Sequence, residues 1–307
     1  MQSPYSKIIV YDLETGGLNY RINPITEIAM VCIDLETLSI IDQMSVMFRP
    51  QLDLSFLDES PSKEAKDIFK CLKTKDLDSG LNIINYKGEK LTLKTLQILI
   101  DDLEKLNTFL LKRSKIISWE DFLEIKKDEQ LCDVISIVFD KCYNPQALDV
   151  THIAIKDLLE GEDPSICFEK INDFIKKHTD RNNKPIFSGH NIGSLPRRII
   201  KGKEKGPDGF DNPFMEKLFD FYKEDFFEVA NDLFLDTLKM ARLRWFSLAN
   251  YSLGTCANEL GLSLKEAHRA LPDTIANAKF LIKMLKNLRG EGSEKKDYKR
   301  EKYNFQF

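Results

Sequence analysis

The sequence predicts an α/β protein, because short apolar strand patterns are followed by longer amphipathic helix patterns along its 307 residues. Residues 7–11 form a β-branched apolar run, and 26–35 and 38–48 alternate well enough to be two further strands of a meander. Hydrophobic residues make up 42% of the chain, which is enough to bury a sizeable core. Later segments predict, in order, a helix at 164–178, a strand at 185–187, a helix at 213–229, a strand at 233–236, and helices at 250–260 and 272–288.

Composition excludes several classes of protein. Charged residues make up 31%, and there are only 14 glycines and 11 prolines, so collagen-like, low-complexity and wholly disordered chains are excluded. No apolar run is long enough to span a bilayer and the first residues lack a signal-peptide pattern, so we expect no membrane association and a cytoplasmic location. The six cysteines show no CxxC spacing, so we expect buried free thiols rather than zinc ligands or disulfides.

The chain divides into a core and additions with their own character. Residues 1–50 and 144–288 carry the α/β pattern, whereas 51–143 is rich in Lys, Asp, Leu and Ile and predicts an inserted, mainly helical subdomain. Residues 289–307 predict a flexible charged tail, with six Lys or Arg against four acids. The net charge of −4 therefore combines an acidic core with short basic segments, which suits a carboxylate metal site with basic substrate contacts.

Two carboxylates end the first predicted strand. Asp12 and Glu14 stand two residues apart, so their side chains share one face of the strand. Adjacent carboxylates repel unless a cation lies between them, and their hard oxygen atoms suit Mg²⁺ or Mn²⁺. An acidic strand end that enters the glycine turn of Gly16 and Gly17 would give the same pattern.

A second pair lies at the start of the last predicted helix. Asp273 is favourably placed at a helix start, and His268 lies five residues earlier, where both side chains can face one site. A histidine with a pKa near neutrality can act as a general base, and the aspartate can bind a metal. A capping aspartate beside a surface histidine is the alternative.

These segments resemble, in this order, the motifs of the DEDDh family of 3′–5′ exonucleases. YDLETGGL at 11–18 is similar to the first motif, and YSLGTCANELGL at 251–262 with HRALPDT at 268–274 is similar to the third. NPQALDVTHIAIKDLLEG at 144–161 and DTLKMAR at 236–242 resemble the segment between sheet and helix and the late strand. The resemblance implies an RNase H-like mixed five-stranded sheet flanked by helices, with the mainly helical subdomain inserted.

The second motif departs from the family pattern. Gly189-His190-Asn191 is followed by Ser194-Leu195-Pro196, and a literal alignment puts Pro196 where the family has an aspartate, which would imply an inactive site. We interpret 194–209 as a basic insertion loop, after which Phe210-Asp211 resumes the motif. This interpretation assigns the metal-binding role to Asp211 rather than to Asp208 or Asp220.

The resemblance implies a two-metal site. Two divalent ions, Mg²⁺ or Mn²⁺, would be bound by four carboxylates, with His268 as the general base: Asp12, Glu14, Asp211 and Asp273. The terminal nucleotide would be seated by residues that follow the first motif: Thr15, Gly16 and Leu18. Asn191 would contact substrate, or form a buried hydrogen-bonding pair with His190. The basic insertion would bind phosphates or form a solvated loop, and its basic residues are Arg197, Arg198, Lys201, Lys203 and Lys205.

The implied function is a metal-dependent 3′–5′ exonuclease that releases 5′-mononucleotides from single-stranded or frayed DNA ends, for proofreading or end trimming. The alternatives are a 3′–5′ exoribonuclease of the RNase T or oligoribonuclease type, and a catalytically silent nucleic-acid-binding polymerase-accessory subunit. A replication or repair protein would bind through the 51–143 insertion or the C-terminal tail. Trp245, Phe246 and Tyr251 follow DTLKMAR, and we expect at least two of them to pack in the core rather than stack on bases.

Overall fold

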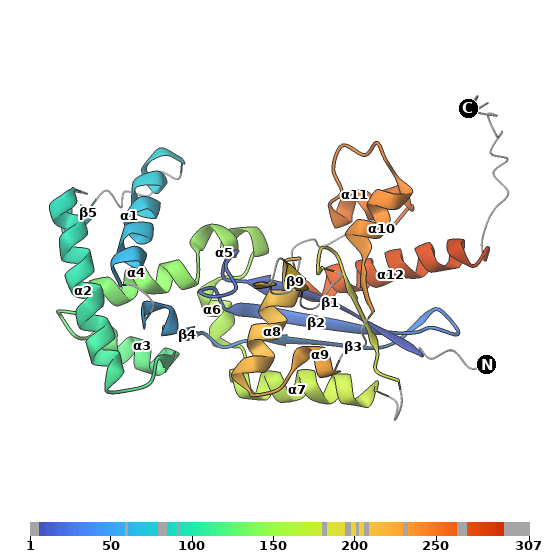
Figure 1. Cartoon of the computed structure of the whole chain (residues 1–307), viewed down its shortest axis with the longest axis horizontal. Helices are drawn as coiled ribbons and strands as arrows, with labels where there is room; N and C mark the ends of the chain where they lie inside the picture. The colour runs from blue at the N-terminus through green and yellow to red at the C-terminus, as the bar shows by residue number, and fades with distance from the viewer. Residues whose placement is uncertain are drawn as a thin grey trace.

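A computed structural model describes most of the chain (Figure 1). The described residues are 6–58, 61–78, 85–90, 92–179, 183–193, 198–200, 203–205, 209–229, 233–262 and 269–291, with backbone alone at 71–78, 85, 198–200 and 203–205. Among them, no helix combines the length and the apolar character that crossing a membrane requires. The side chains of five of the six cysteines are described; all five are free thiols, four of them buried as predicted, whereas Cys132 is partly exposed.

A mixed five-stranded sheet forms the centre of the molecule and confirms the predicted fold class. The three N-terminal strands form an antiparallel meander, and two later strands add in parallel beside the first. In spatial order the strands are β11 (Phe234–Asp236), β8 (Ile186–Gly189), β1 (Lys7–Thr15), β2 (Ile25–Asp34) and β3 (Ser39–Met47).

Helices cover both faces of this sheet, and alternate side chains of β1 pack against the helices on opposite faces. Ile8 and Val10 pack with Ala278 and Leu281 of α12 (Ala270–Leu288) on one face. Ile9, Tyr11 and Leu13 point to the other face, into an apolar cluster shared with α7 and α8. The remaining helices of the core are α5 (Pro145–Thr151), α6 (Ile155–Leu159), α7 (Pro164–Lys177), α8 (Asp211–Phe221), α9 (Phe226–Val229), α10 (Thr237–Arg244) and α11 (Leu253–Glu259).

Residues 51–143 form a mainly helical group at one end of the sheet, on the left of Figure 1. They have an apolar cluster of their own, built on Leu99, Leu103, Val134 and Val138. That cluster continues past the expected boundary to Leu158, and the division into a separate subdomain stays a prediction. The elements are β4 (Gln51–Asp53), a 3₁₀ turn (Ser55–Asp58), α1 (Pro61–Asp78), β5 (Asn85–Tyr86), β6 (Glu89–Lys90), α2 (Leu93–Leu111), β7 (Ile116–Ser118), α3 (Trp119–Lys126) and α4 (Cys132–Cys142).

Three local predictions were wrong. The helix expected at 213–229 is divided into α8 and α9, because Lys223 adopts a left-handed φ of 60° and turns the chain. Within DTLKMAR only Asp236 belongs to a strand, since its carboxylate accepts from the Leu238 N–H at 3.0 Å and caps α10. The insertion expected as a loop contains a short antiparallel pair, β9 (Arg198–Ile200) and β10 (Lys203–Lys205).

The turn after β1 is tied to the end of α4 by one buried asparagine. The Nδ2 of Asn23 donates to the carbonyl oxygens of Lys141 at 2.9 Å and Cys142 at 2.8 Å, and lies 3.4 Å from that of Gly16. The Asn144 N–H also donates to the Gly16 carbonyl, at 2.7 Å. The glycine turn is therefore held by the last residues of the helical segment.

We expect Asn23→Ala to lower the free energy of unfolding by about 1–3 kcal/mol, because it leaves buried carbonyl oxygens without donors. Denaturant titration of the purified variant measures this. Asn19→Ala is the matched control, since the Asn19 side chain accepts from Arg21 at an exposed position. Equal losses in the two variants would contradict the role given to Asn23.

Candidate active site

The carboxylates predicted from the first motif share one face of β1. Ile8 and Val10 point from this face towards α12, so Asp12 and Glu14, further along the same strand, point that way too. The first turn of α12 carries Asp273, whose backbone N–H donates to the Arg269 carbonyl at 3.2 Å. Asp12, Glu14 and Asp273 each offer a carboxylate oxygen, and these atoms all lie within 4.8 Å of one another.

Asp211 is near Asp12, although it is not among the three carboxylates whose oxygens lie within 4.8 Å of one another. It is the first residue of α8 and is buried, and its carboxylate accepts a hydrogen bond from the backbone N–H of Leu13. Leu13 separates Asp12 from Glu14, and the Asp211 charge is the strongest charge effect on Asp12. The gapped interpretation of the second motif therefore puts a carboxylate beside the first motif, whereas Asp220 is exposed on α8. Pro196 and Asp208 lie outside the described residues.

Burial and the charges of neighbouring carboxylates raise the pKa of Asp12, Glu14 and Asp211. The pKa of Glu14 rises to about 8, first because burial disfavours its charge and then because Asp273 and Glu27 lie near. Burial and then Asp211 raise the pKa of Asp12, and burial raises the pKa of Asp211. Such a cluster holds its negative charge readily only when a cation is present.

The donor set fits a divalent metal. The three clustered groups supply only carboxylate oxygens, and Asp211 adds a fourth carboxylate beside Asp12. Hard oxygen ligands of this kind suit Mg²⁺ and Mn²⁺. The residues present can therefore hold divalent ions of this kind.

The residues predicted to seat a terminal nucleotide form the turn after β1. The buried Thr15 hydroxyl donates to the Gly17 carbonyl at 2.7 Å, and the exposed Leu18 side chain projects from the turn with 86% of its area accessible. A Cβ at Gly16 would lie 2.5 Å from the Cys142 carbonyl oxygen, so only glycine fits there. The structure thus places an exposed apolar side chain on a hydrogen-bonded turn that directly follows the strand of Asp12 and Glu14.

Asn191 lies in the turn after β8, exposed and with a left-handed φ of 69°. Its backbone N–H donates to Asp236 at 3.0 Å, and its carbonyl accepts from the Phe210 N–H at 2.8 Å, directly before Asp211. His190 instead bonds to the Thr237 hydroxyl at 3.1 Å and to the Tyr251 carbonyl at 2.7 Å. The predicted His190–Asn191 pair is therefore not what holds this turn, and the Asn191 side chain stays a candidate substrate contact.

Several predicted residues cannot be placed. His268, Arg197 and Lys201 lie outside the described residues, and only the backbone is described at Arg198, Lys203 and Lys205. Their roles stay predictions.

Glu27 beside the site, and the exposed arginines that precede Phe246, were not predicted from the sequence. Glu27 is a buried carboxylate opposite Glu14 in the β1–β2 register, and it is ion-paired with Arg269. A basic aromatic stretch spans the end of α10, where Arg242 and Arg244 are exposed in the last turn and Phe246, two residues further on, is 87% exposed. Trp245 and Tyr251 pack on the Phe280 cluster, as expected for two of the three aromatic residues. The sequence from Thr237 to Asn258 contains no acidic residue, and this could have indicated a basic surface here.

Comparison with known proteins gives partial sequence matches and a fold match. No protein-family model matches the chain. A segment is 36% identical over 76 residues to the PolC-type DNA polymerase III of Bacillus cereus, which covers 25% of this chain and 5% of that protein. The PolC-type enzyme of Bacillus subtilis is 33% identical over 89 residues, covering 29% and 6%.

The solved structures extend the likeness over the fold. Escherichia coli exonuclease I in complex with a dT13 oligonucleotide matches with a TM-score of 0.50 and 13% identity, over 93% of this chain and 42% of that one. Its zinc-bound complex with single-stranded DNA matches equally, with a TM-score of 0.50, 13% identity and coverage of 93% and 41%. The chain has the fold of exonuclease I. This chain spans less than half the length of exonuclease I, and its matched segments span about one-twentieth of the PolC-type proteins.

Asp211→Asn should weaken metal binding without lowering the stability of the metal-free protein. Removing a buried carboxylate relieves repulsion, so we expect the metal-free variant to be at least as stable as the wild type. Mn²⁺ at a hundred times its Kd should stabilise the wild-type protein by about 2.7 kcal/mol and Asp211→Asn much less. Thermal unfolding with and without Mn²⁺ measures both effects.

Asp220→Asn makes the same charge change at an exposed position of the same helix and should keep the full Mn²⁺ effect. If Asp220→Asn lost the effect and Asp211→Asn kept it, the assignment of Asp211 would be overturned.

Proposed function

We propose that this protein is a metal-dependent 3′–5′ exonuclease that releases 5′-mononucleotides from single-stranded or frayed DNA ends. The observation that carries the proposal is the set of carboxylate oxygens of Asp12, Glu14 and Asp273 within 4.8 Å of one another, on an exonuclease fold. The oligonucleotide bound to exonuclease I, which shares the fold, supports nucleic acid as the substrate class.

The chemistry follows from the groups gathered at the strand end. Two bound divalent ions would activate a water molecule and stabilise the departing 3′ oxygen. Asp12, Glu14, Asp211 and Asp273 would orient these ions, and bound cations would relieve the burial and repulsion that raise the pKa of Asp12, Glu14 and Asp211. His268 would accept the proton of the attacking water. Leu18 would pack against the terminal base, since it is exposed beside the cluster.

Two neighbouring functions are the alternatives. An exoribonuclease would use the same carboxylates, and what separates it is recognition of the 2′-hydroxyl group. A silent accessory subunit would need an incomplete carboxylate set, and the position of Asp211 beside Leu13 argues for a complete one. Arg242, Arg244 and Phe246 support contact with single strands, because exposed arginines and aromatics bind phosphates and bases.

The setting of the activity is proposed on the sequence alone. We place the enzyme in the cytoplasm, acting in proofreading or in end trimming. A replication or repair protein would bind at residues 51–143 or at the C-terminal tail, 289–307.

The proposal is tested with a 5′-labelled oligonucleotide. With Mg²⁺ or Mn²⁺ the protein should shorten single-stranded DNA from the 3′ end, and EDTA should abolish the reaction because the carboxylates need the ions. Asp273→Asn is the inactive control. Degradation that persists in EDTA would rule out the metal mechanism, and faster cleavage of the RNA of equal sequence would favour the ribonuclease.

His268→Ala should lower kcat by roughly 10²–10⁴-fold, the usual effect of losing a positioned general base. Metal binding should persist, because all four proposed ligands remain. Single-turnover rates and an Mn²⁺ titration measure the two properties separately. A change in rate below about threefold would show that another group accepts the proton.

A further inference from the structure

Glu27 is a buried carboxylate beside the acidic cluster, with 4% of its surface exposed. It lies opposite Glu14 in the antiparallel register of β1 and β2, so the two side chains share a face of the sheet. The charge of Glu27 contributes to the raised pKa of Glu14. By position alone, Glu27 could be mistaken for a further metal ligand.

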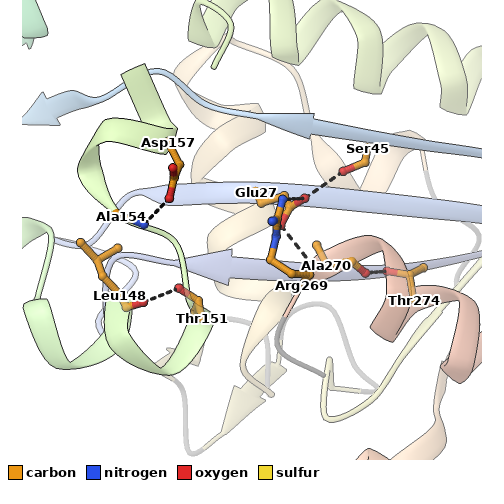
Figure 2. Close-up of polar contacts among 9 residues, drawn as sticks. All are labelled: Glu27, Ser45, Leu148, Thr151, Ala154, Asp157, Arg269, Ala270 and Thr274. Carbon is orange, nitrogen blue, oxygen red and sulfur yellow. Dashed lines mark hydrogen bonds and ion pairs between the residues drawn. The ribbon is translucent and has the colours of Figure 1, made fainter. Parts of the chain in front are cut away.

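The hydrogen-bond partners of Glu27 assign it another role. Its Oε2 accepts from Arg269 Nε at 3.0 Å and from the backbone N–H of Ala270 at 3.3 Å. Its Oε1 accepts from Arg269 Nη2 at 3.3 Å and from the Ser45 hydroxyl at 3.2 Å. Figure 2 shows these contacts converging on Glu27 from β3 and from the start of α12. Both oxygens are occupied by the protein's own donors.

These contacts fix the start of the helix that carries Asp273. Glu27 holds the Arg269 side chain and the first N–H of α12, while the Arg269 carbonyl accepts from the Asp273 N–H at 3.2 Å. A short run of bonds therefore leads from the middle of the sheet to a proposed metal ligand. Within the same helix turn, the Thr274 hydroxyl donates a hydrogen bond to the Ala270 carbonyl at 2.6 Å (Figure 2).

We propose that Glu27 is a positioning residue of this site: through Arg269 and the Ala270 N–H it holds the first turn of α12 so that Asp273 meets Asp12 and Glu14. This inference rests on the proposed function for its effect on catalysis, whereas its effect on metal binding does not. Arg269 is the intermediary, and its cation also offsets the carboxylates, since it lowers the pKa of Glu14. His268, the predicted general base, directly precedes Arg269 in the sequence.

The test compares Glu27→Gln, Arg269→Gln, Arg269→Lys and the double variant Glu27→Gln/Arg269→Gln. Losing a partner that orients metal ligands costs about 10–100-fold in metal affinity or activity, so we expect the Kd for Mn²⁺, measured by isothermal titration calorimetry, to rise at least about 10-fold in Glu27→Gln. Arg269→Gln should match it, and the double variant should lose no more than either, because the two residues act through one contact. Arg269→Lys keeps the charge and should fall between the wild type and Arg269→Gln.

Kinetics supply the second measurement. In Glu27→Gln, kcat at saturating Mn²⁺ should fall about 10-fold, while the KM for the oligonucleotide changes less than about threefold, because no substrate contact is removed. Glu64→Gln is the matched control: Glu64 is a buried acid paired with Lys141 in the helical segment, so its loss should reduce stability without changing the Mn²⁺ Kd or kcat.

Unchanged Mn²⁺ affinity in a folded Glu27→Gln would overturn the proposal. A loss in Glu27→Gln with normal affinity in Arg269→Gln would also overturn it, by showing that Glu27 binds metal directly. If Glu27→Gln does not fold, the two Arg269 variants decide the outcome on their own. A wild-type protein that binds Mn²⁺ but cleaves nothing would refute the proposed function and leave the affinity test intact.

Discussion

Repulsion among carboxylates at the end of β1 is the constraint on which the rest of the site depends. Asp12 is half-buried, and desolvation together with the charges of Asp211, Glu14 and Asp273 raises its pKa. Two helices begin at the cluster, with Asp211 in the first turn of α8 and Asp273 in the first turn of α12. The positive end of each helix dipole therefore offsets part of the repulsion before any ion binds.

The topology of the sheet explains why residues so far apart in the chain meet there. β1, β8 and β11 run in parallel, so their carboxyl ends lie at one edge of the sheet. Asp236 at the end of β11 accepts from the N–H groups of Asn191 and Gly193, which fixes the turn after β8. That turn accepts the Phe210 N–H and so sets the start of α8. Asp211 reaches Leu13, even though an insertion precedes it, because the bonded ends of β8 and β11 hold the start of α8 beside β1.

Local patterns were enough to predict some of these features and not others. The alternation in β1 predicts that Asp12 and Glu14 share a face, because strand geometry depends on nothing else in the chain. Asp211 required a gap of 16 residues to be assumed, and the basic insertion and His268 stay predictions. Glu27 was missed because it stands in the apolar run ITEIAM, where a lone acid has no visible partner. Its role depends on strand register and on Arg269, 242 residues away, and neither is a local property.

Glu14 and Glu27 lie opposite each other in the sheet. They differ in the source of the positive charge that balances each carboxylate. Glu27 takes its cation from the chain, since Arg269 bonds to both of its oxygens. Asp273, Glu27 and Asp211 all raise the pKa of Glu14, and Arg269 only partly offsets them, so most of its positive partner must come from solution. Breaking the Glu27 pair would leave a buried charge without compensation, which typically costs 3–5 kcal/mol. Glu27, whose charge is balanced by Arg269, therefore stabilises the fold, whereas Glu14, whose charge is only partly balanced within the protein, can bind a metal ion.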